Sequence, residues 1–297
     1  MIPRVLRLAG TVVAPTTLLT GLLFYFGQMY VAGYCRYFGV NFTTLDLSVR
    51  DYLIRSVEGI FLPLVLAAAG ALVVLWLVRV VLQVLDARTR EKVLRIGLPV
   101  VAAAGSVLIA LAGIALAVGG TVGDTAPELG GLSLAVGVVA VAATVPRLLD
   151  RRRAEEIPGA LRAEIAVAEW AAAFVLASVG LFWAVGSYAT GIGTGRAQEL
   201  EAALPVWPDT VVYSQHSLAL TGPGIVEQTC AGPDDAYRFR YEGLKLVLQS
   251  GGQYFFLPAG WSAAAGGAAL VLPRTDTLRL EFTDASRPAS GGCAGLP

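Results

Sequence analysis

The stretch that most constrains this chain is an uncharged apolar run from Ala171 to Thr194. A helix of this length can cross a lipid bilayer, which takes about 20 residues at a rise of 1.5 Å each. Further apolar runs precede it, whereas prolines, turn glycines and alternating apolar residues follow it. The run therefore predicts a spanning helix that joins a membrane domain to a small soluble domain.

The composition supports this interpretation. Of 297 residues, 56% are hydrophobic and 15% are charged, and the mean hydropathy is +0.66, outside the usual range of soluble globular proteins. We predict a multi-span α-helical membrane protein, with five transmembrane helices in residues 1–194 and a small C-terminal extracytoplasmic β-rich domain in residues 195–297. The predicted spans are residues 10–33, 58–80, 96–120, 129–147 and 166–191.

The first run, Leu8 to Cys35, follows a short basic head, which is also the general form of a cleaved signal peptide. The run is longer than a usual signal-peptide core, and bulky aromatic residues rather than a small-residue cleavage pattern occupy its end. We therefore expect a retained helix. Its aromatic residues predict a belt at the membrane interface; they are Phe24, Tyr25, Phe26, Tyr30, Tyr34, Tyr37 and Phe38.

Local signals refine three of the other helices. Ser48 and Asp51 resemble a capping box, with Asp in place of the preferred Glu, and predict a helix start before the second span. Small residues in the third run, Gly105, Gly113 and Ala117, suit close contact between helices. Around the fifth run, aromatic residues fit anchoring positions at the membrane interface; they are Trp170, Trp183 and Tyr188.

The arginines predict the orientation. If the N-terminus is cytoplasmic, the cytoplasmic segments hold twelve basic residues, and the opposite segments hold four when only Arg196, next to the fifth span, is counted from the C-terminal domain. The positive-inside rule then places the N-terminus in the cytoplasm and, after five crossings, the C-terminal domain outside. The abundance of arginine over lysine, together with many Ala, Gly and Val residues, suggests a bacterial origin. The predicted location is therefore a bacterial cell membrane.

The C-terminal domain is expected to be a five-strand set. Its predicted strands are Val211–Leu220, Tyr237–Gln249, Gln253–Leu257, Leu270–Leu272 and Leu278–Phe282. A tight turn at Ser250, Gly251 and Gly252 should join the second strand to the third. At the other boundary, the glycines of the fifth run are expected to loosen the join between the two domains; they are Gly191, Gly193 and Gly195.

Three cysteines are too few for a disulfide scaffold and are not spaced for a metal site. Cys230 and Cys293 both lie in the domain that the arginine count places outside, where oxidising conditions favour disulfides. We predict that these two residues form a bridge worth about 2 to 4 kcal/mol.

No catalytic constellation emerges from the sequence. His216 is the single histidine, and Ser214, Ser217 and Asp209 are too close to it on one expected strand to converge as nucleophile, base and orienter. The carboxylates Glu227, Asp234 and Asp235 are more consistent with ordinary loop chemistry than with an acid–base pair. We predict no cofactor, no metal site and no catalytic residue.

Two groups of residues are candidates for contact with a partner or with lipid. The basic residues Arg151, Arg152 and Arg153 follow the fourth span, although such residues also serve only to fix topology. In the β-rich domain, alternation places Tyr254 and Phe256 on one sheet face, and Trp261 follows. Filling of the core on both faces is the favoured alternative for these aromatics.

The sequence thus favours a non-enzymatic integral membrane protein whose outer domain binds, senses or scaffolds. Expected partners are membrane lipids and either a protein partner or a second copy. Zero net charge, from 22 basic and 22 acidic residues, gives no reason to expect nucleic acid. The alternatives are a transporter or channel subunit, although the spans carry no ionisable residue at depth, and, third, an envelope or lipid enzyme at the outer face.

Overall fold

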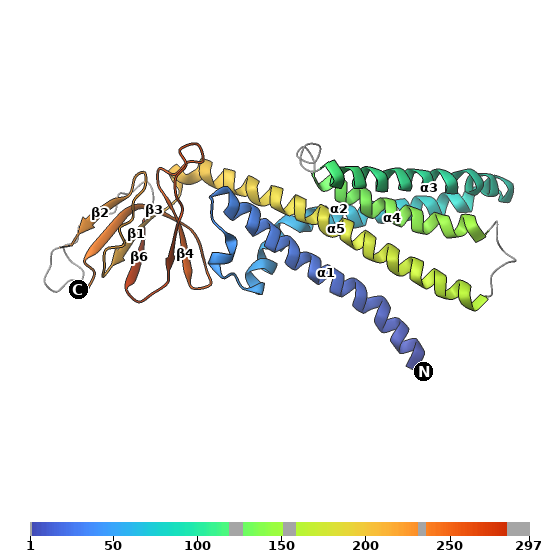
Figure 1. The fold of residues 1–297 in the computed structure, drawn as a ribbon, viewed down its shortest axis with the longest axis horizontal. Coiled ribbons are helices and arrows are strands. Elements are labelled where there is room, and N and C mark those ends of the chain that lie inside the picture. The colour runs from blue at the N-terminus through green and yellow to red at the C-terminus, as the bar shows by residue number, and fades with distance from the viewer. Residues whose placement is uncertain (1, 119–126, 151–158, 231–235, 284–297) are drawn as a thin grey trace. The chain divides into compact units, whose positions relative to one another are not determined.

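A computed structural model describes residues 2–118, 127–150, 159–230 and 236–283 (Figure 1). Five long helices come first: α1 (Ile2–Tyr37), α2 (Val49–Val84), α3 (Ala87–Val118), α4 (Pro127–Asp150) and α5 (Gly159–Ala203). Two short 3-10 helices are η1 (Phe42–Leu45) and η2 (Leu204–Val206). Five segments are long and apolar enough to cross a membrane: Thr16–Tyr37, Gly59–Val81, Arg88–Ala117 and Leu129–Leu148 within α1 to α4, and Glu164–Val206, which runs from α5 through η2.

The chain divides into two compact units that do not follow a single cut in the sequence. The first contains Met1–Phe26 and Val57–Ala189, and the second contains Gly27–Ser56 and Thr190–Pro297. The second unit therefore includes the end of α1, the start of α2 and the end of α5 together with the C-terminal strands. The predicted division into a membrane domain of residues 1–194 and an outer domain of residues 195–297 stays a prediction.

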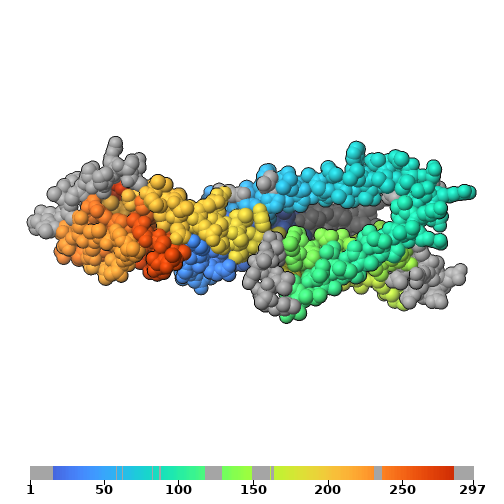
Figure 2. Space-filling model, turned by 90° about the horizontal axis from the view of Figure 1, so that it is seen from above, coloured from blue at the N-terminus to red at the C-terminus, as the bar shows by residue number. Residues whose placement is uncertain are grey.

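In the first unit, small residues allow α3, α4 and α5 to approach closely. A Cβ atom added to Gly105 of α3 would lie 2.9 Å from the carbonyl oxygen of Gly137 in α4, and these two green helices lie along each other in Figure 2. A Cβ atom on Gly131 of α4 would lie 2.6 Å from the carbonyl oxygen of Gly180 in α5. Gly105 makes the close contact that the sequence predicted, whereas an added Cβ atom on Gly113 meets nothing within 4 Å.

The outside of the first unit is apolar over long stretches. Every residue from Leu64 to Val81 in α2 is exposed, including Trp76 at 67%. Apolar side chains on all sides of a helix are compatible with a membrane location, where lipid tails rather than water surround them.

The second unit is built on an antiparallel sheet of six strands (Figure 1). The strands are β1 (Asp209–Ser214), β2 (Val226–Thr229), β3 (Phe239–Ser250), β4 (Gln253–Pro258), β5 (Leu270–Pro273) and β6 (Leu278–Thr283). Their order is β5-β4-β3-β1-β6, and β2 also pairs with β3. On one face Val212, Tyr241, Leu244 and Phe256 form a buried core.

The sheet differs from the expected set in two places. The first expected strand ends at Ser214, earlier than predicted. The strand β2 was not predicted, because all four of its residues are exposed and its sequence therefore lacks the alternation of apolar and polar residues that marks a half-buried strand. The turn at Gly251 and Gly252 is confirmed, because Ser250 pairs with Gln253 and both glycines have positive φ angles.

The join before the sheet also differs from expectation. Helix α5 continues without interruption to Ala203, through the three glycines that were expected to loosen it. Gly193 is instead a contact point within the second unit, since an added Cβ atom would lie 2.1 Å from the carbonyl oxygen of Tyr30. Absence of a side chain here permits α1 and α5 to touch backbone to backbone.

Candidate functional site: the junction of helix ends and sheet

The start of α2 is tied to the sheet through Asp51. The capping box is confirmed: Asp51 Oδ2 accepts from the Ser48 backbone N–H at 3.0 Å, and the Asp51 N–H donates to Ser48 Oγ at 3.3 Å. The same carboxylate oxygen accepts from the Ser250 hydroxyl at 2.8 Å. The Ser48 hydroxyl also donates to Asp51 Oδ2 at 2.7 Å, and the hydrogen bonds to this carboxylate, that of the Ser48 side chain first, lower the pKa of Asp51.

The β3–β4 turn presses closely against η1 beside this hydrogen bond. A Cβ atom added to Gly251 would lie 2.3 Å from the carbonyl oxygens of both Leu45 and Asp46. Gly251 has a φ angle of 56°, and Asp46 ends η1 with a φ angle of 43°. Two left-handed residues therefore meet where the turn contacts the connection between α1 and α2.

The ends of α1 and α5 share a second carboxylate. Glu201 of α5 accepts a hydrogen bond from the Tyr37 hydroxyl of α1 through Oε2. Its other oxygen, Oε1, accepts from the backbone N–H of Ala263, which follows β4, at 2.9 Å. One side chain thus connects two helix ends to the loop after β4.

Aromatic rings fill the space between these polar contacts. The ring centroid of Phe38 lies 4.9 Å from that of Trp261 and 5.9 Å from that of Phe255, and Tyr37 lies 6.0 Å from Trp261. Edge-to-face arrangements at these distances stabilise aromatic pairs beyond their buried area. Phe38 and Tyr37 therefore pack inside the second unit, and the interfacial belt expected for the end of the first run stays a prediction.

A polar network occupies another part of the sheet. The Tyr213 ring lies between two guanidinium groups, with Arg240 Cζ at 6.0 Å and Arg279 Cζ at 5.9 Å from its centroid. Its hydroxyl donates to Glu281 Oε2 at 3.1 Å. Buried Arg240 pairs with Glu242, so the charges of this network are matched within the second unit.

The residues proposed for partner or lipid contact have different surroundings. Phe256 is fully buried in the sheet core and Trp261 is 5% exposed in the aromatic cluster, whereas Tyr254 is half-buried. Of these three aromatics, Tyr254 alone reaches the surface of the described unit. Arg151, Arg152 and Arg153 lie outside the described residues, and contact through any of these residues stays a prediction.

The polar residues weighed for chemistry are dispersed. His216 is exposed, and its backbone N–H donates to Ser214 Oγ at 3.3 Å. Asp209 pairs with the buried ammonium of Lys245 at 2.8 Å, and Glu227 accepts from the Ser217 hydroxyl at 3.3 Å. Within the described ranges no three metal-ligating side chains gather. Asp234 and Asp235 lie outside those ranges.

The cysteines fall into two environments. Cys35 carries a free thiol and is buried at the end of α1. Cys230 is buried directly after β2, where its backbone N–H donates to the Arg238 carbonyl at 2.8 Å. Cys293 lies outside the described residues, so its pairing with Cys230 stays a prediction.

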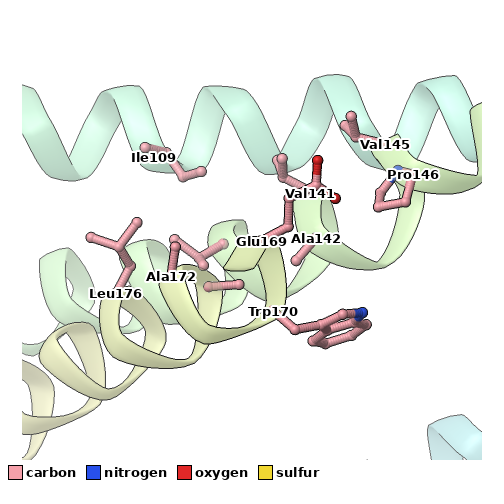
Figure 3. A pocket seen from close by; sticks show the side chains of 11 residues that line it. Ile109, Val141, Ala142, Val145, Pro146, Glu169, Trp170, Ala172 and Leu176 are labelled. Carbon is pink, nitrogen blue, oxygen red and sulfur yellow. The ribbon is translucent and has the colours of Figure 1, made fainter. Parts of the chain in front are cut away.

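The first unit contains a separate groove of about 330 Å³ between α3, α4 and α5 (Figure 3). Its walls are apolar apart from one carboxylate, that of Glu169. Glu169 lies near the start of the predicted span 166–191, and nothing in its sequence neighbourhood indicated a role.

Sequence reasoning missed the junction because its contacts join positions far apart in the chain. Tyr37 and Glu201 are 164 residues apart, and Asp51 and Ser250 are 199 apart. The capping box and the Gly251–Gly252 turn, both confirmed, were the local signals at this place. The chain matches no protein-family profile, no curated protein and no solved structure.

Proposed function

We propose that this chain is a non-enzymatic integral membrane protein that is anchored by its helices and that binds a partner through its sheet-bearing unit. The observation that carries the proposal is the junction in the second unit. There the ends of α1, α2 and α5 hold the sheet through the Glu201 and Asp51 carboxylates and the Phe38 ring.

Such a junction suits binding, sensing or scaffolding. A sheet on a flexible tether would move freely when a partner bound, whereas a sheet fixed to three helix ends would pass a displacement to all of them. Fixed side-chain networks of this kind have few alternative arrangements, so a bound partner can favour one arrangement over another.

The proposed location is a bacterial cell membrane, with the N-terminus in the cytoplasm and the sheet-bearing unit outside. The five apolar helices and the distribution of arginine support this orientation. A cysteine-free chain carrying Ser286→Cys in the C-terminal segment tests it. We expect a membrane-impermeant thiol reagent to label intact cells, and labelling only after lysis would reverse the orientation.

The binding role is tested by isolating the full chain in mild detergent with and without chemical crosslinking. We expect a reproducible partner, or a second copy, that is lost when residues 197–297 are deleted. Glu201→Gln provides a finer comparison because it leaves the sheet sequence intact and weakens only the junction. If deletion of residues 197–297 leaves every co-purifying protein in place, the sheet-bearing unit does not bind and the proposal fails.

A further inference from the structure

The groove of the first unit has the chemical pattern of an amphiphile. Its side walls are formed by apolar residues of three helices. In Figure 3, Glu169, Trp170 and Pro146 lie toward one end, and Ile109 and Leu176 lie toward the other. One end is therefore charged and aromatic while the other is wholly aliphatic.

The charged end coincides with the boundary of two apolar runs. Pro146 is the last residue of the uncharged stretch in α4, and Glu169 and Trp170 directly precede the uncharged run of α5. Both boundaries meet at one end of the groove, although α4 and α5 are different helices. In a membrane this end would lie at the level of the lipid headgroups, where tryptophan is enriched, and the aliphatic end would lie among the acyl chains.

The Glu169 carboxylate has no cationic partner among the described residues. Its side chain is exposed and extends from α5 into the groove (Figure 3), and it makes no hydrogen bond or ion pair with the part of the chain that the structure describes. Arg147 is the basic residue next to Pro146 in the chain, and its guanidinium donates instead to the carbonyl oxygen of Ala143. An unpaired carboxylate beside an apolar wall favours a ligand that brings a cation.

We propose that this groove binds a membrane lipid with an ammonium headgroup, of the phosphatidylethanolamine type. The ammonium would donate hydrogen bonds to the Glu169 carboxylate. One acyl chain would follow the groove past Ala173 to Ile109 and Leu176. Charge complementarity thus selects an ammonium lipid over an anionic one.

The proposal rests on the membrane location given under Proposed function, and it is independent of what the sheet binds. The test uses the full chain, stripped of lipid in detergent and titrated with phosphatidylethanolamine or with phosphatidylglycerol. Native mass spectrometry then counts the lipids that each chain retains. We expect phosphatidylethanolamine to bind at least tenfold more tightly than phosphatidylglycerol.

Two variants and one control locate the site. Glu169→Gln should remove the preference between the two lipids, whereas Glu164→Gln should keep it, because Glu164 is exposed on the same helix like Glu169 but does not line the groove. Ala173→Leu narrows the groove, keeps the carboxylate and should weaken binding of both lipids. It tests the groove independently if Glu169→Gln fails to fold.

Three outcomes would overturn the proposal. They are equal binding of the two lipids by the unaltered chain, an unchanged preference in Glu169→Gln, and a dimer that retains no lipid, which would make a second copy the occupant. A chain recovered in the soluble fraction of cells would instead refute the membrane location itself. The two failures are therefore distinguishable.

Discussion

The hydroxyl of Ser250 donates a hydrogen bond to Asp51 across 2.8 Å, although the two residues are 199 positions apart in the chain. Ser250 opens the turn between β3 and β4, and Asp51 lies in the first turn of α2. The acceptor is a carboxylate that already closes the helix cap with Ser48. One ionised group therefore stabilises the helix start and fixes the edge of the turn.

This arrangement predicts an acid-sensitive junction. The pKa of Asp51 is lowered in the folded unit, by the hydrogen bond of the Ser48 side chain first and then by that of Ser250. A lowered pKa gives stability that is present above the unfolded value, about 3.9, and that is lost as the pH falls through the folded value. We expect the full chain in detergent to show a falling midpoint of thermal unfolding from pH 5 downwards.

Two substitutions assign this pH dependence. In Asp51→Asn the midpoint of thermal unfolding should depend less on pH below 5, because the amide does not titrate and its oxygen still accepts a hydrogen bond. Asp276→Asn, at an exposed site between β5 and β6, should leave it unchanged. An acid transition of the same size in Asp51→Asn would show that other groups cause the loss.

Substitution of Glu201 should destabilise the sheet more than substitution of the neighbouring Glu199. Glu201→Gln weakens charge-assisted hydrogen bonds from Tyr37 and Ala263, which contribute about 1.5 to 3 kcal/mol each in proteins. Glu199→Gln removes only an exposed pair with Arg196, which is worth about 0 to 1 kcal/mol. Hydrogen exchange of the sheet amides should therefore accelerate in the first variant and change little in the second.

The sequence carried enough information to predict the helices, because their signal is local. Runs such as Ala171 to Thr194 contain no charge, and the structure places a long apolar helix at each predicted span. The Ser48 and Asp51 cap and the Gly251 and Gly252 turn were also predictable, since each depends on adjacent residues.

Which segments of the chain pack together in the second unit could not be predicted in the same way. Phe38 follows the first apolar run just after Arg36 and has the pattern of an interfacial residue, and nothing local indicates that its ring packs against Phe255 and Trp261. No periodicity in the chain records which distant partner an aromatic residue meets. The groove around Glu169 was missed for the same reason, because three separate helices form its walls.

Two glycines with the same backbone angle should respond differently to alanine. Gly243 and Gly252 both have φ angles of 73°, and alanine in this region costs about 1 to 2 kcal/mol. An added Cβ atom on Gly252 meets nothing within 4 Å, whereas one on Gly243 would lie 1.9 Å from the Gly224 carbonyl oxygen. Gly243→Ala should therefore lower the free energy of opening of the sheet by clearly more than Gly252→Ala, as measured by hydrogen exchange. Equal losses would show that the Gly224 loop yields freely.

The helix crossing of α4 and α5 gives a matched comparison in the first unit. A Cβ atom on Gly131 would lie 2.3 Å from the Ala184 backbone nitrogen, so Gly131→Ala should separate the two helices and lower the thermal midpoint of the full chain in detergent. An added Cβ atom on Gly113 meets no atom within 4 Å. Gly113→Ala should therefore raise that midpoint slightly, because alanine is more stable than glycine within a helix by about 0.5 to 1 kcal/mol. If both variants lose stability equally, close contact at Gly131 is not what holds α4 against α5.

The cysteines predict a defined pattern of alkylation. Cys35 is buried with a free thiol, and we predict that Cys230 and Cys293 pair, so the folded chain should react slowly with iodoacetamide. The chain unfolded without reductant should gain one carbamidomethyl group, at Cys35, and the reduced chain should gain three, since the sequence holds three cysteines. Peptide mass spectrometry identifies the sites, and Cys35→Ser is the control that should reduce these gains to none and two. Three groups on the unreduced, unfolded chain would refute the bridge and remove one argument for an extracytoplasmic sheet, because disulfides persist where the surroundings are oxidising.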